Sequence, residues 1–261
     1  MEFCANLSWL FNEYDFFTRL AKAKEYGFDF IEVLFPYEYA ISDIKQQLIN
    51  HKLDLALINS PVYDWNTGGR GYLCVPNKEA DFLRSIEQAR NYASSLGCNK
   101  VHLMSGNIPS DLSGKYLESL YKERLIHACD FFQQSQIKVL IEPLNPQDMP
   151  GYYLNSMTQA LRIIEQMNHP NLGLQFDVYH CQKIHGNLIH YINQTWDHIE
   201  HLQIASVPER NEPDTGEVDY SYLFNYIDNK GYQGLIGCEY APKNTTIEGL
   251  TWIQNLIEDR T

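Results

Sequence analysis

The sequence contains no long apolar run. Nowhere in its 261 residues do about eighteen apolar residues follow one another, as a membrane-spanning helix requires. The first residues, MEFCANLSW, also lack the basic segment followed by an apolar stretch that is typical of a signal peptide. We therefore expect a protein of the cytoplasm that does not interact with membranes.

Paired cysteines are missing as well. The chain has six cysteines, and no two of them form a CxxC pair. Many metal and redox sites use such pairs, and disulfide frameworks belong mainly to small secreted proteins. We expect reduced, partly buried thiols at positions 4, 74, 98, 129, 181 and 238.

Positive charge is scarce. Lys and Arg number 20 against 33 Asp and Glu, which gives a formal net charge of −13. Nucleic acids and anionic membranes are bound through clustered Lys and Arg, so the charge argues against both as partners. A small anionic substrate remains compatible, because a few local cations can override the overall field.

Short apolar segments alternate with helical ones along the whole chain. The strand candidates are residues 3–8, 30–35, 55–60, 100–106, 138–144, 172–178, 198–205 and 234–240. Apolar residues recur with the helical period over residues 14–26, 79–96, 116–134, 157–167, 219–229 and 246–258. Glycines at positions 27, 97 and 231 follow helical segments, where a left-handed C-terminal cap is expected.

Eight strands with helices between them predict an α/β fold, a (β/α)8 TIM barrel, formed as a single domain over residues 1–261. A doubly wound parallel sheet is the alternative, but it usually has a glycine-rich loop after its first strand. Here the first strand leads into NLSWLFNEY, which contains no glycine. In a TIM barrel the chemistry lies at the C-terminal ends of the strands.

Oxygen-bearing side chains end the last four predicted strands. Glu142, Asp177, Gln203 and Glu239 are separated by 35, 26 and 36 residues, each close to one strand–helix unit. One such acid alone could cap a helix or pair with an arginine, whereas four successive strand ends aim at one point. Three carboxylates there would repel one another unless a cation joined them. Because the ligands are oxygens, Mg²⁺ or Mn²⁺ is predicted before Zn²⁺.

Long segments of the sequence match a known pattern. They are ANLSWLF (5–11), GFDFIEVLFPY (27–37), DWNTGGRGYLCVP (64–76), FDVYHCQ (176–182), HLQIASVPERNEPDTGEVDY (201–220) and GYQGLIGCEYAP (231–242). In these segments the chain resembles the hydroxypyruvate isomerases of the xylose-isomerase-like barrels, a group that includes the 2-oxo-tetronate isomerases. The resemblance implies a metal held by Glu142, Asp177, Gln203 and Glu239, with Glu142 and Glu239 as proton donor and acceptor. The wider sugar-isomerase group usually has a histidine at the position of Gln203.

An anionic substrate needs positive groups beside the acidic cluster. The candidates, in order, are Arg210, His180, Lys183 and Arg70. The resemblance implies that His180 and Arg210 contact substrate oxygens, whereas for Lys183 and Arg70 a position in solvent is favoured. His102 is either a partner of Glu142 or a core residue. Glu32, on the second strand, could support the site, and we do not count it as catalytic.

The resemblance implies an isomerase that moves a carbonyl group within hydroxypyruvate or a 2-oxo-tetronate through an enediolate. Three alternatives stay open: a ketose 3-epimerase, a metal-dependent phosphodiesterase like the apurinic-site endonucleases, and a barrel that binds without catalysis. Ketose epimerases usually have a histidine where this chain has Gln203, which argues against the first alternative. The net charge argues against the second. The sequence leaves open which acid is the substrate and whether the protein is a homo-oligomer.

Overall fold

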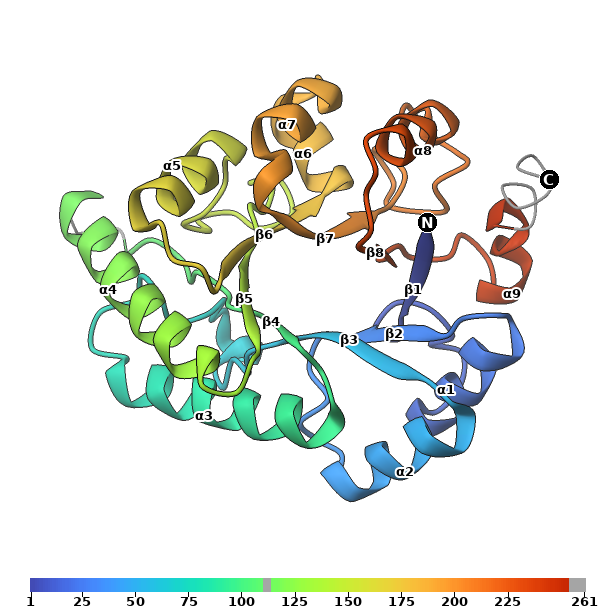
Figure 1. The fold of residues 1–261 in the computed structure, drawn as a ribbon, viewed down its shortest axis with the longest axis horizontal. Coiled ribbons are helices and arrows are strands. Elements are labelled where there is room, and N and C mark those ends of the chain that lie inside the picture. The colour runs from blue at the N-terminus through green and yellow to red at the C-terminus, as the bar shows by residue number, and fades with distance from the viewer. Residues whose placement is uncertain (110–113, 254–261) are drawn as a thin grey trace.

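Eight parallel strands close into a barrel in the computed structural model, which describes residues 1–109 and 114–253 (Figure 1). The strands follow one another around the barrel in chain order, and β8 pairs with β1. They are β1 (Glu2–Asn6), β2 (Phe30–Val33), β3 (Asp54–Asn59), β4 (Lys100–His102), β5 (Lys138–Ile141), β6 (Leu172–Asp177), β7 (Ile199–Ile204) and β8 (Leu235–Cys238). This confirms the predicted (β/α)8 barrel.

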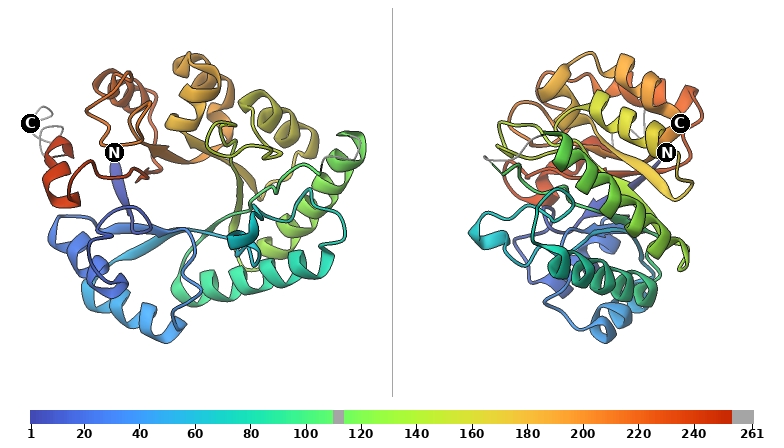
Figure 2. Two further views of the ribbon diagram at one scale, coloured as in Figure 1. Left: turned by 180° about the vertical axis from the view of Figure 1, so that it is seen from behind. Right: turned by 90° about the vertical axis from the view of Figure 1, so that its left-hand side faces the viewer.

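The helices lie outside the strands and surround the barrel in every view (Figure 2). They are α1 (Phe16–Glu25), α2 (Ile41–His51), α3 (Glu79–Leu96), α4 (Gly114–Gln133), α5 (Met157–Met167), α6 (Val178–His185), α7 (Leu188–Thr195), α8 (Tyr220–Asn229) and α9 (Thr246–Gly249). Short 3₁₀ turns cover Trp65–Thr67 and Trp196–His198. Parallel strands covered by helices are buried on both faces, which explains their near-continuous apolar sequences.

The predicted helix stops are confirmed. Gly27, Gly97 and Gly231 adopt φ angles of +91°, +74° and +81°, which disfavour any residue with a Cβ atom. Helix α3 spans the predicted residues 79–96 and buries its apolar face against the barrel.

The structure adds helices that the apolar period does not indicate. Helix α2 buries only Ile44 and Leu48, and α7 buries only Ile192 and Thr195, so neither leaves a long periodic pattern. Helix α6 buries four consecutive residues at its start, which hides its period. Of the predicted helix 246–258, α9 forms the beginning, and residues 254–258 lie outside the described residues.

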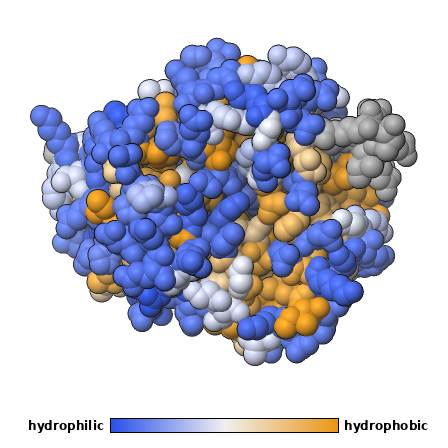
Figure 3. Space-filling view, viewed as in Figure 1, coloured by the Kyte–Doolittle hydropathy of each residue, from blue (hydrophilic) through white to orange (hydrophobic). Residues whose placement is uncertain are grey.

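Apolar side chains fill the space between strands and helices. In Figure 3 hydrophilic residues dominate the visible face, and apolar residues gather toward its lower right. All six cysteines are buried and free, as expected. Among the described helices, none has both the length and the apolar character needed to cross a membrane.

One layer of the barrel interior is polar. Residues two apart in a strand point to the same side, so Gln175 lies below Asp177 on β6 and His201 lies below Gln203 on β7. Asn6 on β1 and Glu32 on β2 extend this layer. Each of these side chains is almost completely buried. The layer therefore lies directly beneath the C-terminal ends of the strands, where the predicted site residues begin.

Candidate active site

The predicted acidic residues meet at the C-terminal end of the barrel. Glu142 is the first residue after β5, Asp177 is the last of β6, and Glu239 is the first after β8. All three are buried. Glu142, Asp177 and His180 offer ligand atoms that lie within 4.8 Å of one another.

Asp177 has two roles that use different oxygens. Its Oδ1 accepts a hydrogen bond of 3.1 Å from the His180 backbone N–H and so caps α6. Its Oδ2 is buried and has no hydrogen-bond partner among the described residues. The helix-capping interpretation of this acid is thus correct for one oxygen and leaves the other available to a ligand.

Glu142 also presents a free oxygen. Its Oε2 accepts a hydrogen bond of 2.9 Å from Nε2 of Gln175, whereas its Oε1 is buried without a partner in the described part of the chain. A buried carboxylate oxygen without a donor costs free energy, and a bound cation would remove that cost. These two free oxygens therefore fit the predicted divalent ion.

Arg210 supplies positive charge to the cluster. Its Nη2 lies 2.6 Å from Oε1 of Glu239 and 3.8 Å from Oδ2 of Asp177. The guanidinium lies 4.6 Å from the ring centroid of Trp9 and 4.8 Å from that of Tyr179. Since cation–π contacts with two rings restrict its motion, the Arg210 side chain is held in place at the acidic cluster.

The fourth predicted ligand, Gln203, lies at the base of the cluster. Its Nε2 donates to Oε2 of Glu239 at 2.5 Å and to Oε1 of Glu32 at 2.9 Å. Its Oε1 accepts a hydrogen bond of 2.6 Å from Nε2 of Gln175. A carbonyl oxygen has two lone pairs, so this oxygen retains one for a further partner.

Burial dominates the electrostatics of the acids. It raises the pKa of Glu142 well above its usual range, and Glu239 and Asp177 raise it further. Burial also raises the pKa of Glu239 to about 8 and raises that of Asp177, although Arg210 acts against both shifts. For Arg210, burial lowers the pKa, but its acidic neighbours outweigh this effect and raise it overall. Three ionised carboxylates thus need more positive charge than Arg210 provides.

His180 is oriented as a hydrogen-bond donor. Its Nδ1 lies 3.1 Å from the backbone N–H of Asn145 and 2.8 Å from Nδ2 of the same residue. Both groups are donors, because Oδ1 of Asn145 accepts from the backbone N–H groups of Gln147 and Asp148. Burial lowers the pKa of His180 well below its usual value, so the ring is neutral and carries its proton on Nε2. Binding a metal through Nε2 would require the proton to be on Nδ1. That N–H would then face the two N–H donors of Asn145, which is unfavourable.

His102 lies beside Glu142. Its Nδ1 is 3.5 Å from Oε2 of Glu142 and 3.3 Å from Oδ1 of Asn59, and its Nε2 has no partner among the described residues. Burial lowers the pKa of His102 to about 3, so the ring is neutral at physiological pH. The structure therefore places His102 next to a candidate ligand as an uncharged neighbour.

Lys183 and Arg70 have other partners. Lys183 donates to Oδ1 of Asp148 at 2.8 Å and to the hydroxyl of Tyr179 at 3.0 Å. Arg70 donates to the backbone oxygens of Trp65 and Gly69, and its guanidinium lies 4.2 Å from the Trp65 ring centroid. Within residues 1–109 and 114–253, neither cation forms a hydrogen bond or ion pair with the acidic cluster.

Sequence reasoning missed the residues that orient the cluster. Asn145, Gln175 and His201 are each buried and polar. For Gln175 and His201 a signal existed, since each precedes a predicted ligand by two residues on the same strand. Nothing in the sequence identified Asn145, because its contact with His180 joins the loop after β5 to the first turn of α6.

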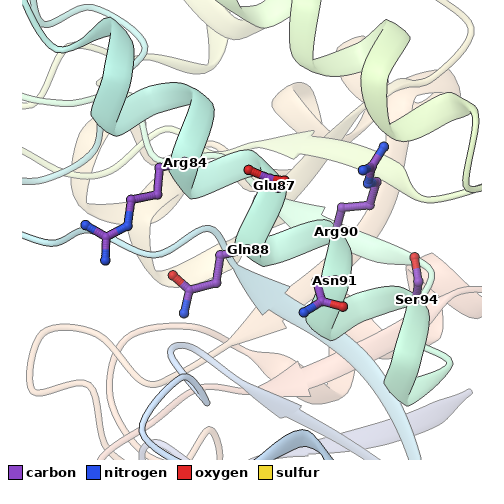
Figure 4. A pocket seen from close by; sticks show the side chains of 6 residues that line it. All are labelled: Arg84, Glu87, Gln88, Arg90, Asn91 and Ser94. Atoms are coloured by element: carbon purple, nitrogen blue, oxygen red, sulfur yellow. The ribbon is translucent and has the colours of Figure 1, made fainter.

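A separate surface hollow lies on the outer side of α3. Its lining side chains all come from that helix (Figure 4): Arg84, Glu87, Gln88, Arg90, Asn91 and Ser94. None of them is a predicted site residue. The candidate active site is therefore the acidic cluster at the strand ends, and not this hollow.

Known proteins resemble the chain over almost its full length. The xylose isomerase-like TIM barrel family matches residues 20–256. The hydroxypyruvate isomerase of Escherichia coli is 42% identical over 253 residues, which cover 97% of this chain and 98% of that protein. The 2-oxo-tetronate isomerase of Cupriavidus necator is 42% identical over 252 residues, covering 97% of each. A crystal structure from Brucella melitensis, described as AP endonuclease, family 2, has a TM-score of 0.94 and 40% identity, covering 97% of this chain and 98% of that one.

Proposed function

The chain belongs to the xylose isomerase-like TIM barrel family and is an isomerase of small hydroxy-oxo acids, and from this premise we propose a divalent-metal-dependent reaction on hydroxypyruvate or a 2-oxo-tetronate. The observation that carries the proposal is the pair of free, buried oxygens on Glu142 and Asp177 beside the Glu239–Arg210 pair. Such an arrangement suits a cation and an anionic substrate together.

The residues that would hold the ion are Glu142, Asp177, Gln203 and Glu239, all through oxygen. This donor set favours Mg²⁺ or Mn²⁺. When bound, such an ion acts as a Lewis acid that stabilises negative charge on the substrate oxygens. His180 stays outside the ligand set, because Asn145 holds it as an Nε2–H donor.

The two glutamates transfer the proton. In hydroxypyruvate one carboxylate removes a proton from C3, and an enediolate forms as electron density moves toward the C2 carbonyl. The second carboxyl group delivers a proton to C2, while the hydroxyl proton passes from the C3 oxygen to the C2 oxygen. The product is tartronate semialdehyde, and no atom is gained or lost. Proton exchange with water then deprotonates the base and reprotonates the acid, which completes the cycle. Arg210 Nη2 contacts Glu239, and its positive charge favours the ionised form of this carboxyl group. We therefore assign Glu239 as the base in this direction and Glu142 as the acid.

Arg210 and His180 bind the substrate. The Arg210 guanidinium offers N–H donors to the substrate carboxylate, since a planar guanidinium matches carboxylate geometry. The Nε2–H of His180, which lies 3.9 Å from Oδ2 of Asp177, donates to a substrate oxygen beside this pair. Both contacts fix the reacting carbons relative to the two glutamates.

The test is turnover by purified protein that has been stripped of metal and then given Mg²⁺ or Mn²⁺. Hydroxypyruvate and 2-oxo-tetronate are offered in parallel, and the larger kcat/KM identifies the substrate. Metal-dependent turnover of either acid supports the proposal. Absence of turnover for both, with metal demonstrably bound, contradicts it.

An endonuclease is the second candidate, because the Brucella melitensis chain carries that description. The net charge of −13 opposes binding to a DNA backbone. Within the described residues, only one group of three side chains from His, Cys, Asp and Glu is close enough to hold a metal. Cleavage of a duplex with one abasic site by the metal-loaded protein would favour this candidate over the isomerase.

A further inference from the structure

We infer that Glu32 is a positioning residue for Gln203: its carboxylate determines which end of the Gln203 amide faces the candidate ligand cluster. The inference rests on the proposed function, because it concerns a proposed metal ligand. It adds a residue of the barrel interior that lies outside the ligand set and binds no substrate.

Glu32 is surrounded by N–H donors. Its Oε1 accepts hydrogen bonds of 2.8 Å from Nδ2 of Asn6 and 2.9 Å from Nε2 of Gln203. Its Oε2 lies 2.6 Å from Nε2 of His201. These donors come from β1 and β7, and only 1% of the Glu32 side chain is exposed. The carboxylate is therefore fixed in place on both oxygens.

Strand β8, which is separated from β2 only by β1, leaves space for this carboxylate. Gly237 lies on β8, and a Cβ atom built there would lie 2.5 Å from both carboxylate oxygens of Glu32. No side-chain carbon can approach an oxygen so closely without displacement. The glycine thus makes the observed position of Glu32 sterically accessible.

The hydrogen bonds define the orientation of the Gln203 amide. Its Nε2 faces oxygens of both Glu32 and Glu239, and its Oε1 faces Nε2 of Gln175, which also donates to Glu142. A flipped amide would place its oxygen against two carboxylate oxygens and its nitrogen against the Gln175 N–H group. Glu32 therefore keeps the amide oxygen, the only atom of this side chain that can bind a hard cation, on the side of Glu142.

Glu32→Gln tests the inference with Mn²⁺ as the probe. A glutamine at position 32 can donate to a flipped Gln203 oxygen, so only Glu239 and Gln175 still oppose the flip and the flipped orientation becomes more populated. The Kd of Mn²⁺, measured by electron paramagnetic resonance without substrate, should rise about tenfold or more. Glu212→Gln is the matched control, because Glu212 is also buried but accepts from the backbone N–H of Lys243 instead. This control should leave the Kd unchanged.

A second variant separates orientation from general damage. In the double variant Glu32→Gln, Gln203→Glu, the ligand at position 203 has two equivalent oxygens and no orientation to lose. We expect its Mn²⁺ affinity to recover most of the loss. An unchanged Kd in Glu32→Gln, or a double variant that binds as weakly as the single one, would overturn the inference.

Two further measurements cover the remaining outcomes. If Glu32→Gln does not fold, Gly237→Ala replaces it, because the added methyl group displaces the Glu32 carboxylate; an unchanged Kd there also overturns the inference. If wild-type protein binds no Mn²⁺, or Asp177→Asn binds it equally well, the proposed function itself fails. The two failures are therefore distinguishable.

Discussion

The guanidinium of Arg210 lies 2.6 Å from Oε1 of Glu239 and packs against the rings of Trp9 and Tyr179. This pair joins the cation proposed to bind the substrate to the carboxylate proposed as base. Arg210 adopts a φ of +60°, and its backbone oxygen accepts a hydrogen bond from Ala241 at 2.8 Å. Its backbone is thus held by the loop after β8, the loop that Glu239 begins.

Arg210→Ala should weaken substrate binding more than metal binding. Loss of a charge-assisted hydrogen bond is expected to raise KM about 10- to 100-fold. The Kd of Mn²⁺ should stay the same or fall, because a positive charge beside the ligands is removed. The KM of Arg210→Lys should lie between those of wild type and Arg210→Ala, since an ammonium keeps the charge but cannot reproduce the planar contact with the rings. Steady-state kinetics and Mn²⁺ titration check this, and an unchanged KM in Arg210→Ala would contradict it.

Lys183 and Arg70 should matter much less for the substrate. Lys183 is paired with Asp148, and Arg70 donates to backbone oxygens of its own loop. We predict that Lys183→Met and Arg70→Gln each change KM by less than about threefold, within the range of an exposed ion pair. A tenfold rise in KM for either variant would show that its side chain moves to the substrate.

Removal of the metal should make stability depend on pH. In the folded protein the pKa of Glu239 is about 8, against an ordinary value of 4.5. A carboxyl group whose pKa is raised by folding contributes stability below its unfolded pKa, and this contribution is lost as pH rises through the folded pKa. The metal-free protein should therefore have a lower Tm at pH 8.5 than at pH 6, and Mg²⁺ or Mn²⁺ should restore it. Glu239→Gln should reduce the difference, whereas an equal pH dependence in the variant would contradict this origin.

The tautomer of His180 can be observed directly. Two N–H groups of Asn145 converge on Nδ1, so the proton should reside on Nε2. In protein labelled with ¹⁵N at histidine, the two ring nitrogens give well-separated signals, and His180→Gln assigns them. We expect a protonated Nε2 and an unprotonated Nδ1 across pH 6–8, because burial keeps the ring neutral. A protonated Nδ1 would instead allow His180 to bind the metal through Nε2.

The sequence predicted the barrel and the acidic cluster because both depend on the order of strands and helices along the chain. Strand ends recur at each strand–helix unit, so Glu142, Asp177 and Glu239 could be placed without coordinates. The partners of Lys183 could not be predicted. They depend on how the turn of α6 that contains Lys183 faces the loop after β5.

The contacts of the orienting residues were also out of reach of the sequence. Whether Glu32 faces Gln203 depends on the stagger of strands across the closed barrel, and a glycine at position 237 makes room for it. Helix α2 escaped prediction for another reason, since Ile44 and Leu48 alone leave too short a pattern.

The most direct test of the account follows the C3 protons of hydroxypyruvate in D₂O by ¹H NMR, with Mg²⁺-loaded wild type, Glu142→Gln and Glu239→Gln. We predict that wild type isomerises the substrate, and that both variants lose about 10²-fold or more of that rate. Glu142→Gln should still exchange the C3 protons for deuterium, because the base is intact, whereas Glu239→Gln should not. Isomerisation at the wild-type rate in either variant would contradict the proposed proton transfer by these two glutamates.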